Sequence, residues 1–233
     1  MLELLFEDAW LRAIVKPPGL LTHRTLLDAH ETTSAHEQAQ AQWNERLWPA
    51  HRLDKGTSGV LLFARDADTA RRLGEAFMAG LPQKQYLAWV RGWPRSEAGR
   101  VDHPLARDPE KPSAGQPLLE AQTDWQLLAR RAWPLRTHPA FDHTRAALLQ
   151  LTPAQGRRHQ LRRHCKHMAH PILGDATHGK GPLNRAVAAH LGLQRLWLHA
   201  HQLSLVHPHT GAPLQLVAAP GPEWARVLAL PSV

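Results

Sequence analysis

The sequence predicts an α+β protein built around a mainly antiparallel sheet. Segments with strand character outnumber those with helical character, and they alternate without the regular strand–helix repeat of a parallel sheet. Of the 233 residues, 43% are hydrophobic and 21% are charged, which is enough apolar material for a sizeable core. We expect one compact domain over residues 1–233, with room for two lobes.

The N-terminal segment and the single cysteine indicate the compartment. MLELLFED carries acidic residues where a secretory signal carries basic ones, and no apolar run approaches the roughly 18 residues of a membrane span. Cys165 has no second cysteine with which to form an internal disulfide or a thiolate zinc site. We therefore expect a soluble cytoplasmic protein.

The first half of the chain begins with a predicted hairpin. LELLF and LRAIVK have strand composition around the turn EDAW, and the Pro-Pro-Gly of residues 17–19 ends the second strand. Composition predicts a surface helix over Asp28–Trp43. The apolar run at residues 59–64 predicts a strand buried on both faces. Asp66 and Asp68 are the candidate N-caps of the next helix, which is expected to end at Gly80. Its apolar stripe consists of Ala70, Leu73 and Phe77.

The second half contains most of the predicted strands. Alternating side chains predict a strand over Lys84–Val90, and dense Pro, Gly and charge predict a loop with short strand pieces over residues 92–116. Leu118–Leu128 and Thr144–Thr152 are expected to pair antiparallel. The remaining predicted elements are a helix over Arg157–Met168, strands over Leu196–Leu205 and Leu214–Val217, and a closing helix over Pro222–Leu230.

Basic residues are in excess, with 28 Lys and Arg against 20 Asp and Glu, a formal net charge of +8 and a pI near 10.5. Some proteins are basic only for solubility. Position favours an acidic partner here, because no Asp or Glu lies between Arg145 and Arg163 to neutralise the arginines there. The predicted helix places Arg158, Arg162 and Lys166 on one basic face, opposite an apolar stripe of Leu161, Cys165 and Met168. Positive charge focused in this way favours nucleic acid.

The loop from His51 to Gly59 is the strongest candidate for chemistry. Asp54 lies between Arg52 and Lys55, so we expect an ionised carboxylate in a positive field, able to act as a nucleophile or a base. The alternative is that Asp54 only stabilises the turn that follows it. The glycine spacing matches neither a phosphate-binding loop nor a hydrolase elbow.

Tyrosine and histidine residues give weaker signals. Tyr86, the only tyrosine, either stacks on a base or packs as an ordinary half-buried strand residue. His164, His167 and His170 are three residues apart with no carboxylate between them, which is not the pattern of a catalytic zinc site. We interpret the histidines as solvated residues or phosphate contacts, and Cys165 as a buried, inert thiol. No catalytic metal is expected.

Five segments carry a pattern over nearly the whole chain. They are VKPPGL at 15–20, HRLDKGTSGVLLFA at 51–64, KQYLAWVRG at 84–92, QGRRHQLRRH at 155–164 with HPILGD at 170–175, and LHAHQLSLVHPHTG at 198–211. In order and spacing they resemble the RluA-type pseudouridine synthase family, and the combination of HRLD, TSG and HQLR is highly specific. The chain departs from the family pattern at Gln155, where threonine is usual, and at the ATHG segment after Asp175, where many members have a tyrosine before the glycine.

The resemblance implies a central mixed, mainly antiparallel sheet with flanking helices, a catalytic cleft between two subdomains, and no separate N-terminal RNA-binding domain. It implies three catalytic residues. Asp54 is the catalytic aspartate, Tyr86 stacks on the target base and takes part in proton handling, and Arg162 pairs with the aspartate carboxylate. Together with the basic helix, the resemblance predicts RNA contacts at Arg52, Lys84, Arg157, Arg158 and Lys166.

The implied activity converts uridine in RNA to pseudouridine, and it implies no redox partner, no group donor and no cofactor. LLTHR, GLQRLWLHA and QLSLVHPHTG resemble the tRNA-directed branch of the family, which indicates uridine 65 in the TΨC stem of tRNA as the target. We expect a monomer that acts on tRNA. The alternatives are an rRNA-directed synthase of the same family and a catalytically silent RNA-binding protein.

Overall fold

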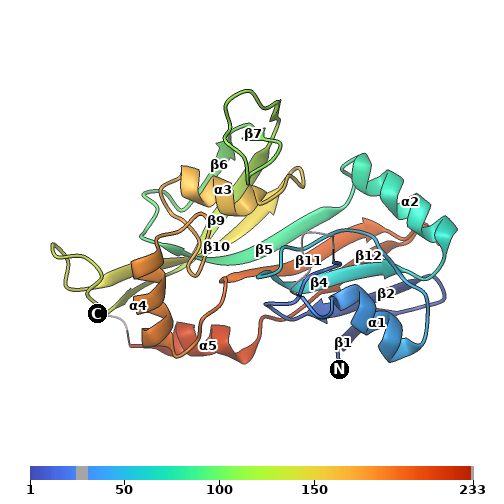
Figure 1. The fold of residues 1–233 in the computed structure, drawn as a ribbon, viewed down its shortest axis with the longest axis horizontal. Coiled ribbons are helices and arrows are strands. Elements are labelled where there is room, and N and C mark those ends of the chain that lie inside the picture. The colour runs from blue at the N-terminus through green and yellow to red at the C-terminus, as the bar shows by residue number, and fades with distance from the viewer. Residues whose placement is uncertain (25–30, 232–233) are drawn as a thin grey trace. The chain divides into compact units, whose positions relative to one another are not determined.

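The computed structural model describes residues 1–24 and 31–231, which divide into two compact units (Figure 1). Unit 1 consists of Met1–Lys84 and His199–Pro220, and unit 2 consists of Gln85–Leu198 and Gly221–Val233. Each unit has its own paired strands and its own cluster of buried apolar side chains.

The strands of unit 1 surround the buried strand β4. Antiparallel pairs join β1 to β2, β2 to β4, and β11 to β12, whereas β4 and β11 are parallel. The predicted N-terminal hairpin is confirmed, and so is the strand buried on both faces, because every residue of β4 is buried. The strands are β1 (Glu3–Glu7), β2 (Leu11–Lys16), β3 (Trp48–Pro49, paired with β4), β4 (Ser58–Ala64), β11 (Leu198–Val206) and β12 (Pro213–Val217).

Gly59 lets β4 and β11 approach each other closely. Its φ is +113°, and a Cβ atom built there would lie 2.1 Å from the carbonyl oxygen of Ala200. Any side chain would therefore push the parallel strands apart. The glycine of the TSG motif thus makes a close backbone contact that only glycine permits.

Two helices belong to unit 1. The first, α1 (Ala35–Trp43), begins later than predicted because the Ser34 side chain accepts the N–H of Glu37 and caps the helix there. Residues 31–34 are not helical, and Asp28 lies outside the described residues. The second, α2 (Ala67–Met78), is capped by Asp66 and followed by Gly80 at a φ of +70°, as predicted.

Unit 2 contains four antiparallel strands in the order β5, β10, β9, β6. The predicted antiparallel pairing of β9 with β10 is confirmed, and β9 extends to Trp133, which lies opposite Thr144. The predicted start at Leu118 is wrong, because β9 begins at Gln122 and Leu118–Leu119 is a separate short strand. With the parallel pair in unit 1, these antiparallel strands confirm an α+β fold with a mixed, mainly antiparallel sheet. The strands are β5 (Gln83–Arg91), β6 (Ala98–Asp102), β9 (Gln122–Trp133) and β10 (Thr144–Pro153), with a separate short pair of β7 (Leu105–Ala106) and β8 (Leu118–Leu119).

Three helices belong to unit 2, namely α3 (Gln160–His167), α4 (Gly181–Leu191) and α5 (Pro222–Ala229). In Figure 1, α3 lies across β9 and β10. The sequence prediction missed α4, although Pro182 at its first turn and Gly192 just after its end are helix boundary signals. Its apolar residues Leu183, Val187 and Leu191 recur every four residues.

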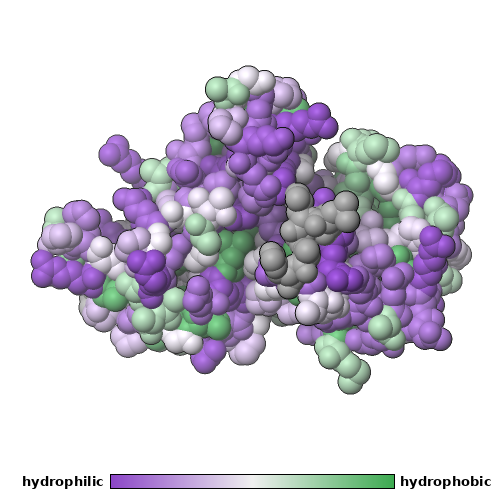
Figure 2. Space-filling model, viewed as in Figure 1, coloured by the Kyte–Doolittle hydropathy of each residue, from purple (hydrophilic) through white to green (hydrophobic). Residues whose placement is uncertain are grey.

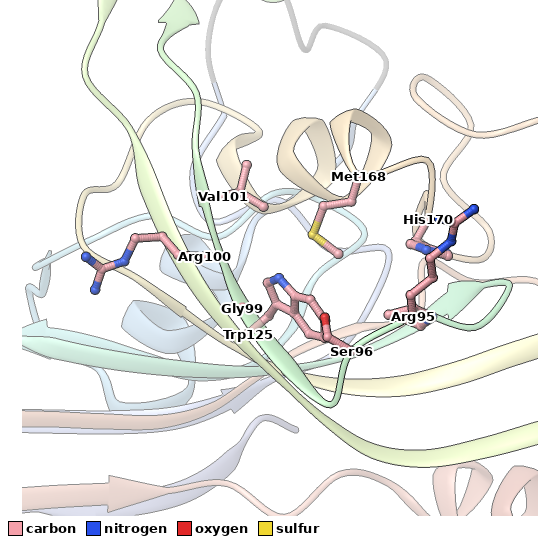
Figure 3. A pocket seen from close by; sticks show the side chains of 9 residues that line it. Arg95, Ser96, Gly99, Arg100, Val101, Trp125, Met168 and His170 are labelled. Carbon is pink, nitrogen blue, oxygen red and sulfur yellow. The ribbon is translucent and has the colours of Figure 1, made fainter.

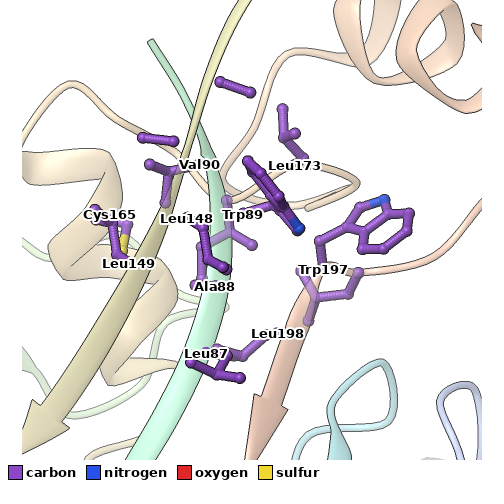
Figure 4. Close-up of a cluster of buried hydrophobic side chains, with 14 of the residues drawn as sticks. Leu87, Ala88, Trp89, Val90, Leu148, Leu149, Cys165, Leu173, Trp197 and Leu198 are labelled. Atoms are coloured by element: carbon purple, nitrogen blue, oxygen red, sulfur yellow. The ribbon is translucent and has the colours of Figure 1, made fainter. Parts of the chain in front are cut away.

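Tryptophans dominate the core of unit 2. Trp89, Trp133 and Trp197 are almost completely buried, and Figure 4 shows Trp89 and Trp197 among the leucines of this cluster. Hydrophilic residues cover most of the face in Figure 2. Among the described residues, no helix is long and apolar enough to cross a membrane.

Candidate active site

Asp54 lies in the loop that leads into β4. Its side chain is half-buried, whereas Arg52 is exposed and Leu53 is buried. The turn that follows is closed through the main chain, because the carbonyl oxygen of Asp54 accepts the N–H of Thr57 at 3.0 Å. The loop therefore has a turn at Asp54 that is closed by a main-chain hydrogen bond.

A buried lysine fixes this loop. The Lys16 side chain is fully buried, and its ammonium group donates to three main-chain carbonyls, those of Pro17, Leu20 and Lys55, at 2.8, 2.6 and 3.2 Å. The Thr22 hydroxyl adds a second tie, since it donates to the Leu53 carbonyl at 2.9 Å and accepts the Leu53 N–H at 3.0 Å. The KPPG turn and the HRLD loop thus form one rigid structure around Asp54.

His51 at the start of the loop is an uncharged acceptor. Its Nε2 accepts the N–H of Leu62 at 3.2 Å, and its ring stacks on Phe77 with 5.3 Å between centroids. Burial, aided by the positive charge of Lys84, lowers the pKa of His51 to about 4. Burial also lowers the pKa of Lys84.

In unit 2, Arg162 and Asp175 form a buried bidentate ion pair. Arg162 donates Nε–H and Nη2–H to the two carboxylate oxygens, each at 2.8 Å. The Oδ1 atom also accepts the main-chain N–H groups of Thr177 and His178 at 3.0 and 2.9 Å. Burial raises the pKa of Asp175, but the hydrogen bonds from Arg162 and His178 outweigh it, so this pKa lies below its ordinary value. The pair fixes the plane of the guanidinium group.

The turn that carries Asp175 is itself specified by close contacts. Gly174 has a φ of +73°, and a Cβ there would lie 1.7 Å from the carbonyl oxygen of Arg195. Asn184 of α4 accepts the Gly174 N–H at 3.1 Å and donates to the Asp175 carbonyl at 2.8 Å. The unpredicted helix α4 therefore positions the acid that holds Arg162.

Tyr86 lies on β5, half-buried, directly opposite Leu151 of β10. It packs against the apolar core of unit 2. This placement fits either alternative, a packed strand residue or a ring that takes part in stacking, and its role stays a prediction.

The predicted basic helix face is wrong in two respects. Helix α3 begins at Gln160, so Arg157 and Arg158 precede it, and Arg162 is buried rather than exposed. Neutralising acids come from elsewhere in the sequence, since Arg158 pairs with Asp108 and Glu110, and Arg162 pairs with Asp175. Arg157 donates to the Glu120 carbonyl at 2.9 Å, whereas Lys166 is exposed on the helix.

The interpretation of the histidines as solvated is wrong for His164. It is buried, with Nδ1 2.8 Å from the Thr123 hydroxyl and Nε2 3.0 Å from the His103 carbonyl. The prediction for Cys165 is confirmed, because its thiol is buried and burial raises its pKa to about 12. No group of three His, Cys, Asp or Glu side chains in the described part of the chain could hold a metal ion.

The sequence patterns did not identify the buried polar contacts of Lys16 in unit 1 or of Asp175 and His178 in unit 2. Burial lowers the pKa of His178 to about 4, and its Nε2 lies 3.2 Å from Nδ1 of His159. The signal was the motif itself, because Asp175 ends HPILGD and Lys16 begins KPPG. A single aspartate or lysine in the sequence does not by itself indicate that its side chain is buried with hydrogen-bond partners.

Comparison with known proteins decides the family. Residues 11–167, more than half of the chain, match the RNA pseudouridylate synthase family. The chain belongs to this family. It is 42% identical to tRNA pseudouridine synthase C of Pasteurella multocida over 97% of this chain and 95% of that protein. It is 40% identical to tRNA pseudouridine synthase C of Vibrio cholerae over 98% and 95%, respectively.

Solved structures of pseudouridylate synthase domains share the fold. Human RNA Pseudouridylate Synthase Domain Containing 4 superposes with a TM-score of 0.70 at 29% identity, covering 97% of this chain and 91% of that one. Human RNA Pseudouridylate Synthase Domain Containing 1 superposes with a TM-score of 0.72 over 100% and 97% of the two chains. At 21% identity, the second comparison concerns the fold alone.

Proposed function

We propose that this pseudouridine synthase isomerises uridine to pseudouridine in tRNA, at uridine 65 of the TΨC stem. The observation that supports a tRNA substrate most directly is the full-length similarity of about 40% to two tRNA pseudouridine synthases C. The target position rests on the likeness of LLTHR, GLQRLWLHA and QLSLVHPHTG to the tRNA-directed branch.

Asp54 is the reacting group in this proposal. The C1′–N1 glycosidic bond breaks, the base rotates, and a C1′–C5 bond forms, while the proton lost from C5 is balanced by one gained at N1. A carboxylate can attack carbon 6 of the ring or carbon 1′ of the ribose, or it can act as a base in an elimination. The rigid loop around Lys16 supports the role, because it fixes the backbone on either side of Asp54.

Arg162 is the proposed partner of the reacting carboxylate. Its bidentate pair with Asp175 uses the Nε–Nη2 edge of the guanidinium group, which restricts the group to one orientation. A guanidinium held in this way can stabilise a carboxylate without having to reorganise during the reaction. Asp175 then acts as a positioning residue.

RNA binding requires the target base to leave its helical stack, at a cost of a few kcal/mol. We propose that stacking on Tyr86 offsets part of this cost. Phosphate contacts supply the remaining affinity, from Arg52, Lys84, Arg157, Arg158 and Lys166. Arg158 contributes least, because it already pairs with two acids.

The test offers three RNAs to the purified protein and maps pseudouridine chemically. They are transcribed tRNA with uridine at position 65, the same tRNA with cytidine there, and protein-free large-subunit rRNA. We expect pseudouridine in the first RNA only. Modification of the rRNA alone, or of another uridine in the cytidine-bearing tRNA, would contradict the proposed target.

A further inference from the structure

A pocket of about 350 Å³ lies in unit 2, on β6, β9 and the segment that follows α3 (Figure 3). Figure 3 shows Trp125 of β9 and Met168 pointing toward one another across it. Arg95 and His170 lie together at one end, and His170 is fixed there because its Nδ1 donates to the Arg91 carbonyl at 2.8 Å. An aromatic ring, a thioether and a cation form the kind of lining that binds a flat, anionic ligand.

The orientation of Trp125 is set by a glycine. A Cβ built at Gly99 would lie 2.9, 3.0 and 3.0 Å from three adjacent atoms of the indole ring. Nearly equal distances to three adjacent ring atoms place Gly99 under one face of the ring. The indole is half-buried and lines the pocket, and the face away from Gly99 is the one that Gly99 leaves uncovered.

The two arginines of the pocket differ in whether a carboxylate neutralises their charge. Arg100 forms a bidentate pair with Asp124, at 2.6 and 3.0 Å, and Figure 3 shows it pointing away from Trp125. Arg95 is exposed and forms no ion pair with any carboxylate in the described ranges. Its charge is therefore available to a phosphate group at the same end of the pocket as His170.

Strand register relates this pocket to Tyr86. Trp125 lies directly opposite Leu151, and Leu151 lies directly opposite Tyr86. Residues paired directly across antiparallel strands point to the same face of the sheet. Two strand spacings of about 4.8 Å separate Trp125 from Tyr86, so their Cα atoms are roughly 10 Å apart. This distance is within reach of nucleotides a few steps apart on one RNA strand.

We propose that this pocket binds an unpaired base of the RNA substrate, a few nucleotides from the base that stacks on Tyr86. The base stacks on the open face of Trp125, Met168 borders it, and Arg95 contacts its phosphate. The inference rests on the proposed function for its substrate. It adds a second base-binding site whose recognition is independent of the reacting uridine.

The experiment measures the dissociation constant for transcribed tRNA and the single-turnover rate at saturating enzyme. Trp125→Leu removes the aromatic face and keeps apolar bulk, so we expect its Kd to rise about 5- to 150-fold. Trp125→Phe keeps a ring and is expected to bind within a few-fold of the wild type. Both variants should keep the saturating single-turnover rate, because the pocket contributes binding and not chemistry.

Charge is tested with a matched arginine. Arg95→Ala is expected to lower the slope of log Kd against log salt by about one, as the loss of one phosphate contact does. The control is Arg46→Ala in unit 1, an exposed arginine that also lies beside a tryptophan, Trp48, at 4.9 Å. An equal change in both variants would mean general charge loss and would overturn the role of Arg95.

Photocrosslinking identifies the bound nucleotide, with mass spectrometry to map the peptide that carries it. We expect a crosslink to the peptide containing Trp125. Removing that one base from the RNA should weaken wild-type binding as much as Trp125→Leu does, and should not weaken the variant further.

If wild-type protein makes pseudouridine and Trp125→Leu binds normally, the pocket inference is wrong. If tRNA binds and crosslinks at Trp125 but no pseudouridine forms, the proposed function fails and the pocket inference stands.

Discussion

Asp54 and Asp175 are both aspartates at the end of a sequence motif, yet the two units hold them in different ways. Asp54 is half-buried on a loop whose backbone is fixed by the buried ammonium group of Lys16. Asp175 is fully buried, and its own carboxylate accepts hydrogen bonds from Arg162 and from two main-chain N–H groups. In unit 1, side chains of Lys16 and Thr22 bind the main chain of the residues on either side of the aspartate. In unit 2, the aspartate carboxylate itself accepts the hydrogen bonds that fix the turn.

We infer from this difference that Asp54 has a reactive role and Asp175 a positioning role. A carboxylate that reacts must be able to change its bonding partners, and Asp54 lies on a loop that stays ordered through main-chain contacts. A carboxylate that positions another group must keep its partners, and the lowered pKa of Asp175 keeps it ionised and paired. The substitution Asp54→Asn should therefore mainly lower activity, and Asp175→Asn should mainly lower stability.

The largest effect is expected from Asp54→Asn. The amide keeps the shape of the side chain and removes the reactive charge, so activity should fall by about 10²- to 10⁴-fold. Unfolding by urea and the Kd for tRNA should change little. The measurement is single-turnover pseudouridine formation on tRNA. More than a few per cent of wild-type activity would show that Asp54 is not the reacting group.

Asp175→Asn should mainly reduce stability. Removing one partner of a buried ion pair costs about 3–5 kcal/mol, which would appear in the urea midpoint. The matched control is Asp124→Asn, since Arg100 and Asp124 have the same bidentate geometry but are 60% and 52% exposed. Solvent screens that pair, so its loss should change stability far less. Equal stability losses in the two variants would contradict a structural role specific to Asp175.

In the Asp175→Asn variant, turnover should also fall by a larger factor than tRNA affinity, because Arg162 loses its fixed orientation.

Acid should act on both units through a histidine. Burial lowers the pKa of His51 and of His178 to about 4, from an ordinary value of 6.5. Between pH 6.5 and 4 the unfolded chain therefore binds more protons than the folded chain, so stability falls as the pH falls through this range. NMR titration should find both rings neutral at pH 5. Replacing either with glutamine should flatten the decline, and a ring that titrates near 6.5 would contradict its burial.

The smallest effects are expected from Lys166 and Arg158, two exposed basic residues proposed to contact RNA phosphates. Lys166→Ala should lower the salt slope of tRNA binding by about one. Arg158→Ala should lower it by clearly less, because Asp108 and Glu110 already neutralise this arginine. Binding isotherms at several salt concentrations distinguish the two. A larger effect at Arg158 would mean that RNA displaces both acids.

Local patterns in the sequence determined most elements of the fold. The apolar run of β4, the cap at Asp66 and the alternation in β5 depend on neighbours along the chain, and each predicted its element. The motif around Asp54 is also contiguous, so the candidate reacting group and the family could be predicted from the amino-acid sequence alone. These features are local because backbone propensity, capping and side-chain alternation act over a few residues.

Only the tertiary structure decided which charges are paired. Arg158 and its partner Glu110 are 48 residues apart, and no local pattern indicates that they meet. Arg162 appeared to belong to an exposed basic face, but it is buried, because Asp175 provides the charge that burial requires. The ammonium group of Lys16 likewise donates to carbonyls of two separate segments, at Leu20 and at Lys55. Charge pairing depends on distance in space, and chain folding sets that distance independently of spacing in the sequence.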